Sequence, residues 1–396
     1  MSKREKTSIP DYSIGLDLLR FENVCYYELI KRFVDIFNSE KGPLIYGIEE
    51  GLDAYFSFGL QLDTAVFLYE AVKHMGCIAP KETEAFMSTS EFKILETVRN
   101  NIHTFFKKGN YASKAGKIID NALEEYKLKE PDYLFALRND ISLAFEITDH
   151  TRQLVGCDYF IKHCLFECDG QKWCENDYMN FAKYLSSNIK CLAETVDETS
   201  FQLQSLLTQK QQPQIELFDY KSYDLFAGSK LSNSTAFRLM LIIFQISYGI
   251  LLVEKILSSE SYKNDDLWVC FISKLLSVKY DESIDNLLSL LQYSSTEDKT
   301  VLSSILSETD FDVHNLLARD FARDLRNTIH YQELQYDSTH FICKTTREYI
   351  MAIYLSNTKV QTMQDFRDKA QLMFNEMKKL QIILRKIMNV DKTYSF

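Results

Sequence analysis

The stretch Leu317–His330, LARDFARDLRNTIH, has a residue spacing that decides the fold. Its apolar side chains recur every four residues: Leu317, Phe321, Leu325 and Ile329. Its cations recur at spacings of four, three and four: Arg319, Arg323, Arg326 and His330. On a helix of 3.6 residues per turn these sets form a buried side and a basic stripe. The stretch therefore predicts an amphipathic helix, which we expect to run from Asp312 to about His330.

Composition extends the helical prediction to the whole chain. The 396 residues include 12 Gly and 5 Pro, below the usual shares of about 7% and 5%. Because Gly and Pro mark turns, their scarcity favours long helices over β-sandwiches, barrels and Gly-rich nucleotide-binding loops. Helical periodicity recurs in Tyr26–Phe37, Asp63–His74, Ser90–Phe106, Pro131–Val155, Leu239–Val253, Leu267–Ser277, Thr300–Leu306 and Val360–Met388. The sequence predicts an all-α fold, with Gln214–Tyr220 as a candidate strand.

Charge and cysteine content describe the expected setting. The net charge of −11 argues against general nucleic-acid binding, so any polyanion would need a local basic site. Nine Cys without regular spacing do not indicate a secreted disulfide framework, and no apolar region follows the charged N-terminus. The most apolar stretch, Leu239–Val253, is shorter than the roughly 20 residues of a membrane span and fits a buried core helix. We expect a cytoplasmic protein that does not insert into a membrane.

An internal repeat suggests two related halves. Residues 98–103 read Val-Arg-Asn-Asn-Ile-His, and residues 325–330 read Leu-Arg-Asn-Thr-Ile-His. In both copies Arg and His are four residues apart and would share a helix face. The Gln-rich stretch Ser205–Pro213 lies between the copies and is typical of a linker. We therefore expect two helical-bundle halves, residues 1–205 and 213–396.

The basic stripe needs an anionic partner because its cations repel one another. A phosphate is one candidate, since Arg binds phosphate with two hydrogen bonds. An acidic patch of this acidic chain is the other. In that second interpretation each Arg-Asn-x-x-His face holds a helix–helix interface together through ion pairs with carboxylates.

The Arg-Asn and His pattern late in a long helix resembles the HEPN superfamily, many of whose members are endoribonucleases of defence systems. The family motif is Arg, four to six residues and His, often with Asn after the Arg. Three residues separate Arg326 from His330, and six separate Arg323 from His330. The resemblance implies RNA cleavage without a metal ion, in which His exchanges a proton with ribose and Arg stabilises charge on phosphorus. HEPN domains pair so that the motifs of both line one cleft. The resemblance therefore also implies that the two halves of this chain form an internal pseudo-dimer.

The resemblance assigns the following candidate catalytic residues: Arg326 and His330 as the core pair, Arg323 and Asn327 in assistance, and Arg99, Asn100 and His103 as a second set. It implies an antiviral or toxin-type effector that acts on a specific or structured RNA. An antitoxin or sensor protein and a second copy of the chain are the other expected partners, with no cofactor and no metal. The alternative function is a non-catalytic HEPN-like protein that senses a nucleotide or holds a partner.

Two further patterns leave alternatives open. Five potential zinc ligands, Cys157, His163, Cys164, Cys168 and Cys174, lie within 18 residues, but no two cysteines have the Cys-x2-Cys spacing of compact zinc knuckles. Free or buried thiols are the alternative to zinc. Met363–Met388 is amphipathic and fits either the core or a partner-binding face.

Overall fold

The computed structural model describes residues 12–38, 45–46, 49–106, 144–147, 152–154, 173, 175–194, 196, 201–203, 215–218, 231–257, 263–309 and 311–388. Eleven α-helices make up most of this described part. They are α1 (Ser13–Asn38), α2 (Glu49–Ile78), α3 (Pro80–Met87), α4 (Ser90–Phe106), α8 (Glu175–Ala193), α10 (Asn233–Leu251), α12 (Asp266–Tyr293), α13 (Thr296–Ser307), α14 (Arg319–Asn327), α15 (Thr346–Thr358) and α16 (Met363–Met388). A π-helical turn, η5 (Leu252–Ile256), continues α10, and a short 3-10 helix, η6 (Tyr331–Glu333), follows α14. The predicted helical character is confirmed.

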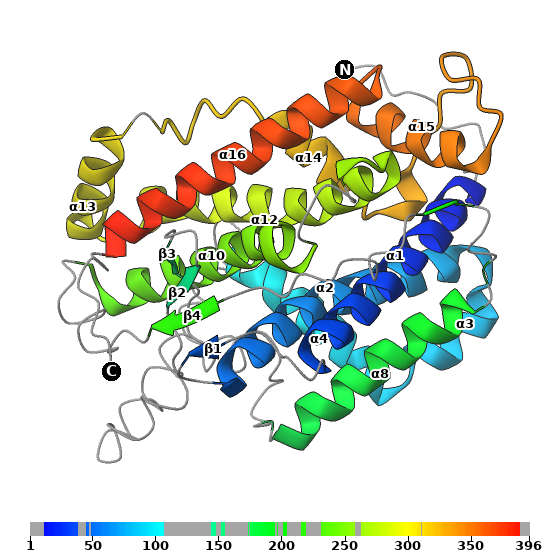
Figure 1. Ribbon diagram of the computed structural model, residues 1–396, viewed down its shortest axis with the longest axis horizontal. Helices are drawn as coiled ribbons and strands as arrows, with labels where there is room; N and C mark the ends of the chain where they lie inside the picture. Colours follow the sequence, from blue (N-terminus) through cyan, green and yellow to red (C-terminus); the bar gives the residue numbers. More distant parts are fainter. Residues whose placement is uncertain are drawn as a thin grey trace.

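Helix α12 lies at the centre of the arrangement and contacts α10, α14, α15 and α16, as well as α1 and α4 of the N-terminal part (Figure 1). It begins where the Asp265 carboxylate accepts a hydrogen bond from the Leu267 amide at 3.0 Å. Its side chains are buried on most sides, which is typical of a core helix. The buried apolar residues, from Leu18 to Ile387, form one continuous cluster, so residues far apart in sequence meet around α12.

The other apolar helices also lie where the sequence places them. Leu239–Val253 is buried in α10 and η5. The apolar side of α16, including Met373, Met377 and Leu380, is buried against the core, so the core interpretation of this helix is confirmed. Within the described residues, no helix is both long enough and apolar enough to cross a membrane.

Four short strands add a small sheet that an all-helical prediction does not include. They are β1 (Ile45–Tyr46), β2 (Ala144–Ile147), β3 (Arg152–Leu154) and β4 (Ile215–Phe218), in the order β1-β4-β2-β3. Strand β4 pairs parallel to β1 and antiparallel to β2, and it confirms the strand predicted in Gln214–Tyr220. The helix expected through Val155 is wrong at residues 144–147 and 152–154, because backbone pairing with β4 and within the β2–β3 ribbon replaces helical hydrogen bonds.

Helix α14 is shorter than the sequence predicts. The expected start, Asp312, instead accepts hydrogen bonds from the His314 amide and the Asn315 side chain, which closes a local turn. The carboxylate of Glu376 on α16 accepts hydrogen bonds from the Leu317 and Ala318 amides, and the helix begins at the next residue.

The C-terminal end of α14 also departs from the prediction. The helix ends at Asn327, because the amides of Thr328, Ile329 and His330 bond to carbonyls three residues earlier. The prediction that His330 lies on the same helix face as Arg326 is therefore wrong. Leu317, expected on the buried side, is 80% exposed because it precedes the helix.

A close approach between α2 and α10 gives a stability prediction. A Cβ at Gly59 would lie 2.2 Å from the buried Tyr248 ring, so we expect Gly59→Ala to lower the free energy of unfolding by about 1–3 kcal/mol. At Gly76 of the same helix a Cβ meets only the Thr83 hydroxyl, at 3.5 Å. Gly76→Ala should be neutral or stabilising by up to about 1 kcal/mol. Urea denaturation measures the free energy of unfolding of both variants. An equal change in the two variants would contradict the prediction.

Candidate functional site

The basic stripe of α14 lies against acidic residues of α12. Arg319 pairs with Asp285 at 2.6 Å, and its side chain is only 17% exposed. Arg323 differs, since its ion-pair partner in the described part is Asp320 of the same helix, at 3.4 Å, and 44% of its side chain is exposed. The counterion of Arg319 is therefore a carboxylate of the chain itself, and Arg323 is the most accessible cation of the stripe.

Arg326 pairs with a carboxylate that is almost fully buried. Its guanidinium lies 2.7 Å from Asp281 Oδ2 and 3.4 Å from Glu282 Oε1. The Asp281 side chain is 1% exposed. Burial raises the pKa of Asp281, Arg326 opposes this shift, and the neighbouring carboxylate of Asp285 adds to it. Arg326 therefore compensates the negative charge of a carboxylate that is almost inaccessible to solvent.

His330 reaches the first half of the chain. Its Nδ1 lies 3.5 Å from Oε2 of Glu70 on α2, while Nε and Nη2 of Arg99 on α4 both donate to Oε1 of the same carboxylate at 3.2 Å. Glu70 is 1% exposed, Arg99 19% and His330 32%. The structure thus brings the Arg of the first motif and the His of the second to one buried carboxylate.

Electrostatics keep Glu70 ionised. Burial acts to raise its pKa, but His330 and Arg99 outweigh burial and the pKa lies below the ordinary value. Glu70 Oε2 has no hydrogen-bond partner among the described residues, and its 3.5 Å contact with His330 Nδ1 is an ion pair only when the imidazole is protonated. A carboxylate beside Nδ1 orients an imidazole and leaves Nε2 for another group. The three side chains form what we call the Arg99–Glu70–His330 site.

The remaining predicted residues belong to α4 and α14, the two helices that carry the repeated motif. Asn100 is exposed on α4, and the backbone of His103 lies in the same helix, although its side chain is outside the described part. The Asn327 side chain accepts a hydrogen bond from Arg326 at 3.3 Å, and we find it beside that Arg and not on the His330 ring. The cluster Cys157–Cys174 and the linker Ser205–Pro213 also fall outside the described residues.

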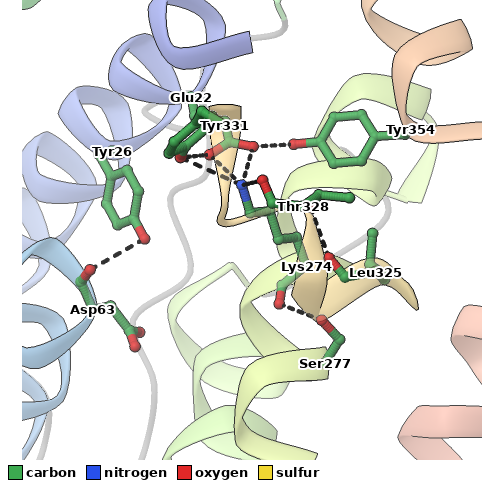
Figure 2. A network of polar contacts seen from close by, with 9 residues as sticks. All are labelled: Glu22, Tyr26, Asp63, Lys274, Ser277, Leu325, Thr328, Tyr331 and Tyr354. Carbon is green, nitrogen blue, oxygen red and sulfur yellow. Dashed lines mark hydrogen bonds and ion pairs between the residues drawn. The ribbon is translucent and has the colours of Figure 1, made fainter. Parts of the chain in front are cut away.

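Residues on both sides of His330 are anchored in a buried network. Lys274 of α12 donates to both oxygens of Glu22 on α1, at 2.7 and 2.8 Å, and to the Thr328 carbonyl at 3.2 Å (Figure 2). The hydroxyls of Tyr331 and Tyr354 donate to the same Glu22 carboxylate, at 2.5 and 2.7 Å. The Lys274 ammonium also lies 4.5 Å from the centre of the Tyr331 ring.

Sequence patterns alone missed Glu70, Asp281 and the Glu22–Lys274 pair. A signal for Glu70 exists within Asp63–His74, where this carboxylate interrupts an apolar helix face and would need a cation when buried. Its partners lie 29 residues away, at Arg99, and in the other half of the chain, so spacing does not reveal them.

No protein-family model, curated protein or solved structure matches the chain. The chemistry of the site is therefore inferred from its own side chains. A partly exposed imidazole with a buried carboxylate at Nδ1 can exchange a proton, and a guanidinium beside it can stabilise negative charge.

Proposed function

We propose that the chain is a HEPN-like endoribonuclease that cleaves RNA without a metal ion, with its active centre at the Arg99–Glu70–His330 site. The observation that carries the proposal is the meeting of Arg99 and His330 on Glu70, since it joins the two copies of the repeated motif. In a HEPN-like pseudo-dimer the two motifs line one site, and here the two halves of a single chain would supply them.

The reaction follows from the positions of these side chains. His330, oriented through Nδ1 by Glu70, takes the proton from a ribose 2′-hydroxyl with Nε2. The 2′ oxygen attacks the adjacent phosphorus, the bond from phosphorus to the 5′ oxygen breaks, and that oxygen receives a proton from His330. Arg99 stabilises the negative charge that develops on the phosphoryl oxygens. The products carry a 2′,3′-cyclic phosphate and a 5′-hydroxyl.

The order of the helices supports two related halves. A long helix, a short helix and a motif helix follow one another in α2–α3–α4 and again in α12–α13–α14. In each set the motif Arg pairs with a carboxylate of the long helix that is 1% exposed, Arg99 with Glu70 and Arg326 with Asp281. In the proposed repeat, Arg326 would correspond to Arg99.

The substrate in this proposal is a structured RNA. The site contains the Glu70 carboxylate and the net charge is −11, so long-range attraction of RNA is weak and binding requires shape recognition or a basic partner protein. Arg323, the most exposed cation of the stripe, is the residue that assists by binding an RNA phosphate. An antitoxin or sensor protein and a second copy of the chain remain the proposed protein partners.

A second candidate function is a non-catalytic helical protein that senses a nucleotide or holds a partner. The pairing of Arg319 and Arg326 with carboxylates of α12, and of Arg99 with Glu70, favours it, because guanidiniums that are neutralised inside the protein bind external phosphate less well. The two functions differ in one measurable property, the cleavage of RNA.

The test is cleavage of total and structured RNA by the purified protein with EDTA present. We expect products with 2′,3′-cyclic phosphate ends, and a loss of about 100-fold or more in rate for His330→Gln. His340→Gln, a change at an exposed histidine beyond the site, is the control and should cleave at the wild-type rate. Equal cleavage by His330→Gln would overturn the proposal, and no cleavage by the wild-type protein would favour the second candidate.

A further inference from the structure

The position of His330 depends on residues that are not part of the Arg99–Glu70–His330 site. His330 lies beyond the end of α14, where its amide donates to the Asn327 carbonyl and its carbonyl accepts from the Glu333 amide. These backbone hydrogen bonds do not by themselves fix its side chain. Two nearby residues, Thr328 and Tyr331, are held in addition by the pair Glu22–Lys274. Lys274 holds the Thr328 carbonyl, and Glu22 accepts the Tyr331 hydroxyl.

The anchoring network and the site also border the same cavity. A cavity of about 50 Å³ is lined by Glu22, Lys274 and Tyr331 of the network and also by Glu70 of the site. Ile329, next to His330, also lines it. A displacement of Tyr331 or Lys274 would therefore change the surroundings of Glu70 as well as the backbone that carries His330.

We propose that Tyr331, Glu22 and Lys274 are positioning residues, which hold the His330 imidazole against Glu70 by fixing the backbone on both sides of it. This inference rests on the proposed function for its catalytic consequence, although the positioning itself is a property of the fold. Glu22 belongs to α1 and Lys274 to α12, so the geometry of the site depends on the packing of these two helices.

The chain offers a matched pair of variants. Tyr331→Phe removes the hydroxyl that donates to Glu22 from the residue beside His330 and keeps the ring. Tyr354→Phe removes a hydroxyl that donates to the same buried carboxylate, but from α15. Both tyrosines are buried, at 3% and 0% exposure, but the Tyr331 hydroxyl also accepts a hydrogen bond from Lys274 at 3.3 Å. The free energy of unfolding of both variants is therefore measured, and the variants are compared under conditions in which both are folded.

Two measurements on the full chain test the inference. In protein with labelled histidine, the imidazole NMR signal of His330, assigned by its absence in His330→Gln, should change in position or width in Tyr331→Phe and stay unchanged in Tyr354→Phe. In the RNA assay, Tyr331→Phe should lower kcat about tenfold with little change in KM, while Tyr354→Phe keeps the wild-type kcat.

The outcomes separate the two proposals. An unchanged His330 signal in Tyr331→Phe, or the same change in both variants, overturns the positioning inference whether or not RNA is cleaved. If the wild-type protein does not cleave RNA, the proposed function fails, and the NMR comparison still decides whether Tyr331 positions His330.

Discussion

Lys274→Met is expected to lower the free energy of unfolding by about 3–5 kcal/mol, because it leaves the Glu22 carboxylate buried without its cation. Both partners are almost fully buried, at 4% and 1% exposure, so solvent cannot replace the lost charge. Burial lowers the pKa of Lys274, and the Glu22 carboxylate opposes that shift. Equilibrium unfolding in urea, followed by circular dichroism, measures the loss.

A double variant tests whether the unpaired charge of Glu22 causes the loss of stability in Lys274→Met. Glu22→Gln removes the charge and keeps an oxygen for the tyrosine hydroxyls, so Glu22→Gln/Lys274→Met should be more stable than Lys274→Met by at least about 1 kcal/mol. Lys369→Met, at an exposed position of α16, is the control and should lie within about 0.5 kcal/mol of wild type. A double variant no more stable than Lys274→Met would show that packing and not charge accounts for the loss.

Arg326→Gln is expected to cause a similar loss, about 3–5 kcal/mol at neutral pH, by leaving Asp281 without its closest cation. The loss should depend on pH. Burial already raises the pKa of Asp281, and without Arg326 the pKa in the folded state rises further above the unfolded value. At a pH between the pKa of Asp281 in the unfolded state and its pKa in the folded state, the folded state binds more protons than the unfolded state. The free energy of unfolding of the variant therefore falls as pH rises through this range. The difference from wild type should therefore be smaller at about pH 4.5 than at about pH 7.5.

Two variants isolate the Asp281 carboxylate as the cause. Asp281→Asn in the Arg326→Gln background should recover most of the stability at neutral pH and remove the extra pH dependence. Arg323→Gln, three residues earlier on α14 and paired with exposed Asp320, should change stability by less than about 0.5 kcal/mol. A loss in Arg326→Gln that is equal at both pH values would contradict the explanation.

The helical part of the fold can be predicted from sequence because its signals are local. The apolar run of α10, the amphipathic pattern of α16 and the strand β4 all lie where periodicity and composition place them. The errors concern contacts between distant segments. Strand β2 pairs with β4, about 70 residues away, and α14 begins beside Glu376 of α16, so no local pattern marks either boundary.

In the candidate site, too, local features can be predicted from the sequence and contacts between distant segments cannot. The repeated Arg and His residues are visible in sequence, and the need for an anion opposite the basic stripe follows from charge repulsion alone. Charge repulsion does not identify that anion. Asp285 and Asp281 belong to another helix, α12, and only the fold determines how α12 lies against α14. Glu70 contacts both Arg99 and His330 through tertiary packing, so the spacing of these residues along the chain does not predict that they meet.

The ion pair between Glu22 and Lys274 has a consequence for the order of events during synthesis. The two residues are 252 positions apart, and the Tyr331 hydroxyl that joins them is 309 positions from Glu22. Contacts of such sequence separation form late, and the first half of a nascent chain emerges long before Lys274 is made. An incomplete chain therefore has neither the anchor of His330 nor His330 itself. If the chain cleaves RNA, the ribosome that makes it is exposed to no activity until the second half has folded onto the first.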